Sequence, residues 1–181
     1  MWVLLFFAYD KVVADMTQQD WFQWYIANDA FWQHDGDMSR PHAETTSGLH
    51  TGTIFNSRIL IENEPMLELA VRDLVDLGED FSLIHTVVGP QTGATKLAIF
   101  ISNEISRRNS RSCNSASPSK QSMEGKKSMV FPSAEIVHLV ENINLLCEDV
   151  VTTGGSINLT EQAVLELGGH VSTTMLVLVN R

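Results

Sequence analysis

The run LLCEDVVTTGGS, from Leu145 to Ser156, carries most of the recognisable chemistry of this chain. Its apolar start predicts a buried strand that ends in two adjacent carboxylates, Glu148 and Asp149. A loop rich in hydroxyl and glycine residues follows, and a helical pattern begins directly after it. Carboxylates suit sugar hydroxyls or a hydrated divalent cation, whereas backbone amides at a helix N-terminus suit a phosphate. The segment therefore predicts a ligand with a phosphate at one end and a diol beside it.

The glycines and the hydroxyls of this loop have separate tasks. Gly154 and Gly155 allow backbone conformations that other residues avoid, and they let a ligand approach closely. Successive amides at such glycines can form an anion-binding nest. The hydroxyls of Thr152, Thr153 and Ser156 can donate hydrogen bonds to phosphate oxygens. An ordinary strand-to-helix turn is the alternative interpretation.

Strand and helix patterns alternate along the chain, which predicts a mostly parallel, doubly wound α/β sheet. In such sheets ligands bind beyond the carboxyl ends of the strands. Asn63 is expected to cap one helix, with Pro65 in its first turn and Gly78 at its end. The expected strands are 53–61, 83–88, 129–131, 143–147 and 171–179, and the other expected helices are 16–32, 157–167 and one after Gly93 that buries Leu97, Ala98, Ile101 and Ile105.

Three segments resemble the type I phosphoribosyltransferases, most closely their orotate phosphoribosyltransferase branch. The run EDVVTTGGS, residues 148–156, is similar to the family's phosphoribosyl pyrophosphate signature. The run VVGPQTGA, residues 87–94, is similar to its pyrophosphate loop, and SGLHTGTIFN, residues 47–56, to the base-binding block of the orotate enzymes. The resemblance covers roughly Thr45 to Arg181. It implies a phosphoribosyltransferase domain over residues 45–181, after an N-terminal helical or hood segment over residues 1–44.

The resemblance implies transfer of a 5-phosphoribosyl group from phosphoribosyl pyrophosphate to a nitrogenous base, most closely orotate, in pyrimidine nucleotide synthesis. Mg²⁺ is the implied cofactor, held through Glu148, Asp149 and the substrate. The implied catalytic residues are Asp149 and Lys120, and Lys120, or alternatively Lys126 or Lys127, closes over the leaving pyrophosphate. The implied phosphoribosyl pyrophosphate site comprises Gly89, Pro90, Gln91, Thr92 and Gly93 together with Glu148, Asp149, Val150, Val151, Thr152, Thr153, Gly154, Gly155 and Ser156.

Three residues are implied to meet the base. Phe55 stacks on it, Thr152 reaches it and Arg181 faces its polar edge. Two of these residues have alternative interpretations. Phe55 equally suits a core position on an alternating strand, and Arg181, as the final residue, suits a frayed end.

The chain departs from the family at positions where the orotate enzymes usually carry basic residues. Its pyrophosphate loop has Thr92–Gly93 in place of a Tyr-Lys pair, and the nearest lysine is Lys96. Thr46 stands in place of a lysine before the base-binding block, and Ala116–Ser117 in place of an Arg-Lys pair before the catalytic lysine. The chain also ends directly after its last expected strand, which suggests truncation or divergence. Two alternatives therefore stay open: a non-catalytic relative that binds phosphoribosyl pyrophosphate or a nucleotide, and a transferase with a purine acceptor.

Composition and charge limit the class of protein. The 181 residues are 44% hydrophobic, which suits one globular domain, and the net charge of −10 argues against nucleic acid as a partner. Half of all Lys and Arg residues nevertheless lie between Arg107 and Lys127. The serine-rich segment 109–127 has little apolar content and predicts a mobile basic loop. It is either a lid over a polyanionic substrate or a solubilising loop, and the resemblance favours the lid because the orotate enzymes carry a flexible lysine-bearing loop here.

The cysteines and the N-terminus suggest a location in the cell. Cys147 is expected to be buried and Cys113 to be exposed, and without a CxxC motif they suit the reducing cytoplasm. The apolar run from Met1 to Ala8 is too short to cross a membrane, so it is expected to be a core or interface element and no membrane contact is expected. The expected assembly is a homodimer.

Overall fold

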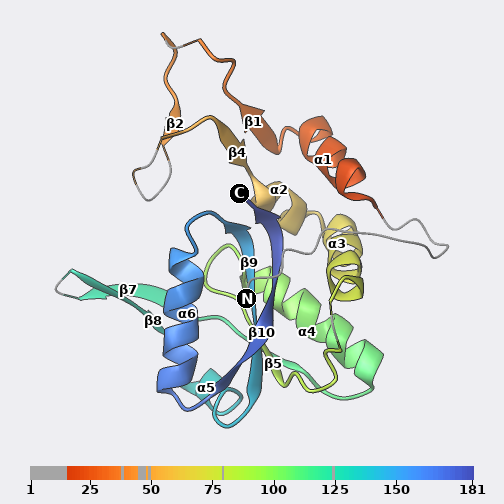
Figure 1. The fold of residues 1–181 in the computed structure, drawn as a ribbon. Coiled ribbons are helices and arrows are strands. Elements are labelled where there is room, and N and C mark those ends of the chain that lie inside the picture. Colours follow the sequence, from red (N-terminus) through yellow and green to blue (C-terminus); the bar gives the residue numbers. More distant parts are fainter. Residues whose placement is uncertain (1–15, 38, 45–47, 49, 79, 124) are drawn as a thin grey trace.

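A parallel sheet forms the centre of the molecule. The computed structural model of the chain describes residues 16–37, 39–44, 48, 50–78, 80–123 and 125–181. Its main sheet has four parallel strands in the order β10-β9-β5-β6. The strands are β5 (Thr86–Val88), β6 (Asn114–Ala116), β9 (Ile143–Val151) and β10 (His170–Asn180). Helices cover both sides of the sheet, which confirms the predicted doubly wound α/β fold (Figure 1).

Two hydrophobic cores lie on opposite faces of this sheet, because successive strand residues point to opposite faces. Val87, Leu145 and Cys147 belong to the core that α3 and α4 cover, and Val88 and Leu146 belong to the core that α6 covers. Both faces are buried, so these strands are apolar in sequence rather than alternating. The covering helices are α3 (Glu64–Asp76), α4 (Thr95–Asn109) and α6 (Gly155–Glu166).

Local sequence signals set the ends of the helices on the α3–α4 side. Asn63 caps α3 and accepts a hydrogen bond from the amide of Met66 at 3.4 Å, as predicted. Pro65 lies in the first turn, where its missing N–H costs nothing. The helix after Gly93 is α4, and it buries the four residues expected, Leu97, Ala98, Ile101 and Ile105.

The N-terminal helix is shorter than predicted. Helix α1 (Gln18–Ala27) begins at a capping box between Thr17 and Asp20. It ends before Asp29, whose φ of 55° is incompatible with a continuing helix. The prediction of a helix to residue 32 was therefore wrong, because Phe31 opens strand β1 (Phe31–Gln33). The spacing of the aromatic residues alone did not show where the helix ends and the strand begins.

A second correction concerns residues 53–61, which were predicted as one strand. Strand β4 (Thr53–Phe55) is short, and helix α2 (Ser57–Glu62) follows it directly. The buried residues of α2 are Ser57, Leu60 and Ile61, a spacing of three and four that belongs to a helix. The apolar run was long enough for a strand, but the helical spacing of its buried residues from Ser57 onward shows that this part is a helix.

An antiparallel hairpin stands apart from the sheet. Strand β1 pairs with β4, and β2 (Ala43–Glu44) pairs with β3 (His50–Thr51) further along the same hairpin. Figure 1 shows this hairpin and α1 above the end of the sheet where β9 and β10 finish. The pairing of β1 with β4 crosses the expected division at residue 44, which remains a prediction. The apolar N-terminal run and Thr46 lie outside the described residues.

The basic segment contains regular structure. Strand β6 joins the main sheet, and β7 (Ser119–Met123) pairs antiparallel with β8 (Lys126–Val130). We call β7 and β8 the basic ribbon; a short helix, α5 (Ser133–Ile136), follows it. Cys113 was expected to be exposed and is instead buried, with 9% of its surface accessible. The mobility of the basic segment stays a prediction.

No helix within the described part of the chain combines the length and apolar character needed to cross a bilayer.

Candidate active site

The sheet brings the acidic pair and the pyrophosphate loop to one edge. Glu148 and Asp149 lie in the second half of β9, and the loop 89–94 follows β5, the neighbouring parallel strand. The two segments touch: a Cβ atom on Gly93 would lie 2.7 Å from Oδ2 of Asp149. Any side chain at position 93 would therefore require the carboxylate of Asp149 to shift. The predicted strand ended at Cys147, whereas β9 continues to Val151, so the acidic pair is held by strand pairing rather than by a loop.

The loop between β9 and α6 has the predicted geometry. Thr152 and Thr153 lie between strand and helix and are exposed. Gly154 is the N-cap of α6, with a φ of 73° that favours glycine. This cap makes no side-chain hydrogen bond to the amides of the first turn. The first turn of α6, which includes Ser156, therefore presents its backbone N–H groups to an anion.

Glu148 is an unusual carboxylic acid. Only 7% of its surface is accessible. Burial, together with a hydrogen bond to Asp149 and the negative charge of Asp149, raises the pKa of Glu148 to about 8, while the charge of Lys120 acts in the opposite direction. A positive charge beside Glu148 lowers this pKa and favours the carboxylate. A buried carboxyl with a raised pKa next to a second carboxylate marks this position as a candidate site for chemistry.

This carboxyl makes protein stability depend on pH. Its pKa in the folded state, about 8, lies above its ordinary value of 4.5, so the folded state binds the proton more tightly. The contribution of Glu148 to the free energy of unfolding should therefore fall by a few kcal/mol as the pH rises from about 4.5 to about 8. Glu148→Gln should remove most of that fall, because glutamine does not titrate. Urea unfolding at both ends of the range measures the difference, and equal slopes in parent and variant would contradict the prediction.

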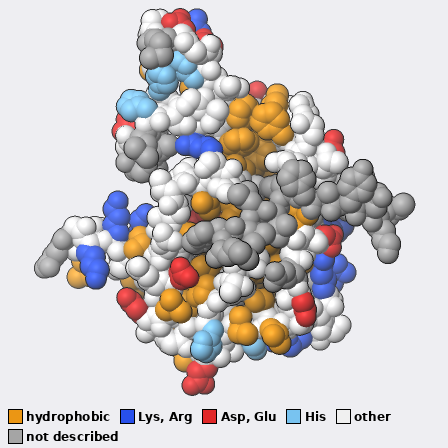
Figure 2. Space-filling view, viewed as in Figure 1, with side chains coloured by type: hydrophobic (Ala, Val, Ile, Leu, Met, Phe, Trp, Pro, Cys, Tyr) orange, Lys and Arg blue, Asp and Glu red, His pale blue; other side chains and the backbone are white. Residues whose placement is uncertain are grey.

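Lys120 lies on the basic ribbon, which carries its lysines on two faces. Across the ribbon Lys120 pairs with Met129 and Ser122 with Lys127, so Lys120 and Lys127 share one face. Met129 on that face is buried in the core that α6 covers. Lys126 lies on the opposite face. Lys and Arg side chains gather on the projecting ribbon in Figure 2.

Tyr25 is a neighbour of the acidic pair that sequence reasoning missed. It lies in α1, its hydroxyl is 3.1 Å from Oγ of Ser57, and 4% of its surface is accessible. Burial raises the pKa of Tyr25 to about 12, and the negative charge of Asp149 adds to the shift. The sequence placed Tyr25 only within the expected helix 16–32. No local signal identified it, since α1 is more than a hundred residues away from Asp149 in sequence.

Phe55, the last residue of β4, lies in an aromatic group formed by the hairpin and α1. Its ring centroid is 4.8 Å from that of Phe31, 5.4 Å from that of Tyr25 and 6.4 Å from that of Phe22. The side chain is partly buried against the main core. These contacts fit the core interpretation, and stacking of Phe55 on a base stays a prediction.

Arg181 is not a frayed end. Its amide donates to the carbonyl of Val151 at 3.0 Å, and its Nη1 donates to the carbonyl of Thr53 at 2.6 Å. These bonds place the guanidinium between β4 and the end of β9, next to Thr152. The three residues predicted to meet a base therefore come from three adjoining segments, although no contact tests their roles.

The described residues contain no cluster of three or more His, Cys, Asp or Glu side chains with the geometry for a metal. Mg²⁺ commonly takes one or two carboxylates and completes its shell with water and phosphate oxygens. Glu148 and Asp149 fit that pattern, because they supply two carboxylates beside the expected position of a diphosphate.

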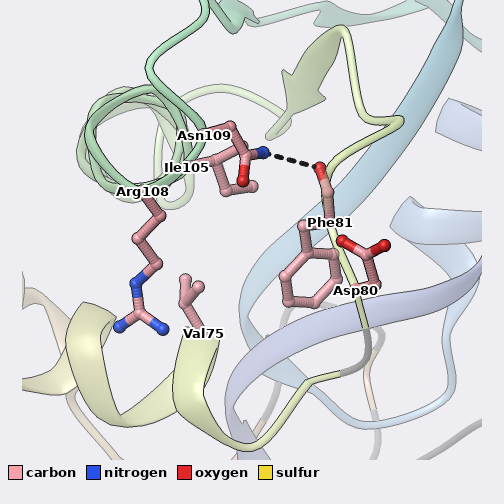
Figure 3. A pocket seen from close by; sticks show the side chains of 6 residues that line it. All are labelled: Val75, Asp80, Phe81, Ile105, Arg108 and Asn109. Carbon is pink, nitrogen blue, oxygen red and sulfur yellow. Dashed lines mark hydrogen bonds between the residues drawn. The ribbon is translucent and has the colours of Figure 1, made fainter.

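One cavity lies away from this edge. It encloses about 170 Å³ between the last turns of α3 and α4 and the segment that enters β5. The side-chain amide of Asn109 donates to the carbonyl of Phe81 at 3.1 Å across it (Figure 3). Since α4 runs back from the carboxyl end of β5, this cavity is at the opposite edge of the sheet. It does not belong to the candidate site. Its lining residues are Val75, Asp80, Phe81, Ile105, Arg108 and Asn109.

Comparisons with known proteins agree with this architecture. No family model matches the chain. The orotate phosphoribosyltransferase of Pelotomaculum thermopropionicum is 30% identical over 145 residues, which cover 79% of this chain and 69% of the relative. That of Desulforamulus reducens is 28% identical over 136 residues, covering 75% of this chain and 65% of the relative. The chain thus spans about two thirds of the length of these relatives.

A solved structure extends the comparison to the fold. Orotate phosphoribosyltransferase from Aeropyrum pernix superposes with a TM-score of 0.59 and 15% identity, over 87% of this chain and 92% of that one. At this identity the likeness concerns the fold alone. With the sequence relatives, it confirms the resemblance read from the motifs: this chain belongs to the orotate phosphoribosyltransferase family.

Proposed function

We propose that the protein transfers the 5-phosphoribosyl group of phosphoribosyl pyrophosphate to orotate. The observation that carries the proposal is the contact between Asp149 and Gly93, which joins a diol-binding carboxylate pair to a pyrophosphate loop. The uncapped N-terminus of α6 lies at the end of the same strand and supplies a position for the 5-phosphate. The curated relatives named orotate phosphoribosyltransferase support the choice of acceptor.

In the proposed reaction a ring nitrogen of orotate forms a bond to the anomeric carbon while the bond from that carbon to pyrophosphate breaks. Positive charge develops on the ribose ring and negative charge on the leaving oxygen. The residues 152–156 hold the 5-phosphate, and Glu148 and Asp149 accept hydrogen bonds from the ribose hydroxyls. Bound Mg²⁺ supplies charge neutralisation to the diphosphate. The protein mainly positions two reactants and stabilises developing charge.

The lysine missing from the pyrophosphate loop is not replaced by its nearest neighbour. Nζ of Lys96 is 2.8 Å from Oε1 of Glu64, so this ammonium is already paired. A lysine at position 93 would also require the carboxylate of Asp149 to shift. The positive charge beside the diphosphate is therefore supplied by Lys120 and Lys127. Both lie on the face of the basic ribbon that carries the buried Met129, which we call its inner face.

The base is proposed to bind next to the end of β9, where three segments of the chain meet. Phe55 offers an aromatic ring, Thr152 a hydroxyl, and Arg181 a guanidinium that suits the carboxylate of orotate. Arg181 donates one hydrogen bond to Thr53, which leaves further donors on its planar fork. A purine has no such carboxylate, so Arg181 favours orotate.

We further propose a cytoplasmic homodimer. Trp32 and Ile54 pair across β1 and β4, and they remain 42% and 37% exposed. Exposed apolar side chains in register suit a subunit contact. Cys113 and Cys147 are both free thiols, as a reducing compartment allows.

The function is tested by release of pyrophosphate from phosphoribosyl pyrophosphate with Mg²⁺ and one base at a time. We expect release with orotate and only background release with adenine or uracil. Release with adenine alone would assign a purine acceptor. Donor binding without release with any base would assign a non-catalytic phosphoribosyl pyrophosphate-binding relative. Absence of both binding and release would contradict the proposed site.

A further inference from the structure

Gln91 connects the pyrophosphate loop to the start of the basic ribbon. Its amide donates to the carbonyl of Pro118 at 2.9 Å, and its Nε2 donates to the carbonyl of Ser117 at 3.0 Å. The amide of Gly89 adds a third bond, to the carbonyl of Ala116 at 3.0 Å. Gln91 was expected to present its backbone amide to pyrophosphate, but this amide already donates a hydrogen bond to Pro118. Within the described loop, Thr92 and Gly93 remain as amides that donate no hydrogen bond.

The segment that receives these bonds is held from both sides. We call residues 116–118 the ribbon root; Ala116 and Ser117 are buried, with 1% and 7% of their surfaces accessible. The amide of Ser117 donates to Oε2 of Glu135, from α5, at 2.8 Å. Strand β7 begins directly after the root, and Lys120 is its second residue. A movement of the root therefore moves Lys120.

We propose that Gln91 is a positioning residue that couples the pyrophosphate loop to the basic ribbon. An anion bound at the amides of Thr92 and Gly93 restrains the loop, and the two bonds of Gln91 carry that restraint to the ribbon root. The ribbon then holds Lys120 over the anion. This inference rests on the proposed function, because it takes pyrophosphate as the ligand of the loop.

The experiment needs a reporter on the ribbon that leaves its inner face clear. Met123 is 72% exposed and lies on the face opposite Lys120. Cys113 and Cys147 are buried, so a spin label reacts selectively with Met123→Cys. Into this labelled protein we introduce Gln91→Met, which keeps length but loses the Nε2 donor. Gln162→Met, at an exposed position of α6, is the matched control.

Two measurements are made with Mg²⁺ and inorganic pyrophosphate: affinity by calorimetry, and label mobility by electron paramagnetic resonance. We expect pyrophosphate to immobilise the label in the parent and in Gln162→Met. In Gln91→Met we expect similar affinity but a largely mobile label. With orotate as acceptor, kcat of Gln91→Met should fall about 3- to 10-fold while the donor KM changes little, as for one lost hydrogen bond.

The outcomes separate this inference from the proposed function. Immobilisation that is equal in Gln91→Met and in the parent would overturn the coupling and leave the proposed function intact. Pyrophosphate that binds the parent without immobilising the label would do the same. A parent that does not bind pyrophosphate would overturn the proposed function and, with it, the coupling.

Discussion

Replacing Lys120 with alanine should lower kcat by about 100- to 1,000-fold, the range seen when one donor to a developing anion is lost. The donor KM should change by less than about threefold, because the lysine meets the leaving pyrophosphate best in the transition state. The charge of Lys120 lowers the pKa of Glu148, so this lysine lies within electrostatic reach of the acidic pair. Steady-state kinetics with orotate as acceptor measures both constants.

Lys126→Ala is the matched control for Lys120→Ala. Both changes remove one ammonium from the same ribbon, but Lys126 lies on the opposite face. We expect Lys126→Ala to retain most of the activity and Lys127→Ala to show an intermediate loss. A silent Lys120→Ala together with an inactive Lys126→Ala would show that the ribbon presents its other face. If none of the three substitutions lowered kcat in an active enzyme, the ribbon would be only a solubilising element.

Changing Asp149 to asparagine should weaken binding of phosphoribosyl pyrophosphate with Mg²⁺ by about 10- to 100-fold, as expected for a lost charge-assisted hydrogen bond. Asparagine has one acceptor oxygen where the carboxylate has two, and it brings no negative charge to the metal. A ligand that binds only the folded state raises the melting temperature by mass action. The variant should therefore show a much smaller rise than the parent at the same millimolar donor concentration.

Glu166→Gln serves as the control for this change. It also removes one carboxylate, at an exposed position near the far end of α6. We expect its donor-induced rise in melting temperature to match the parent's. If the parent itself shows no rise with millimolar donor, the donor site is wrong. If Asp149→Asn keeps the full rise, Glu148 is the residue that holds the diol.

Several features of this protein were determined by short stretches of sequence. The order of acidic pair, glycine turn and helix start at 148–156 appears in the structure as predicted, because each part depends on local backbone preferences. The cap at Asn63 and the capping box at Thr17 depend on side chains that bond to a residue three positions further on. Alternating strand and helix patterns were sufficient for the fold class, since few topologies accommodate them.

Other features were decided only by tertiary packing. Asp149 meets Gly93 because β5 and β9 are neighbours, and Tyr25 approaches them because α1 packs over the same edge. The serine-rich segment pairs into a ribbon and buries Cys113, which composition argued against. Phe31 pairs with Phe55 rather than extending a helix. Local preference selects among conformations that differ by about 1 kcal/mol per residue, so burial and strand pairing between distant segments decide where the two disagree.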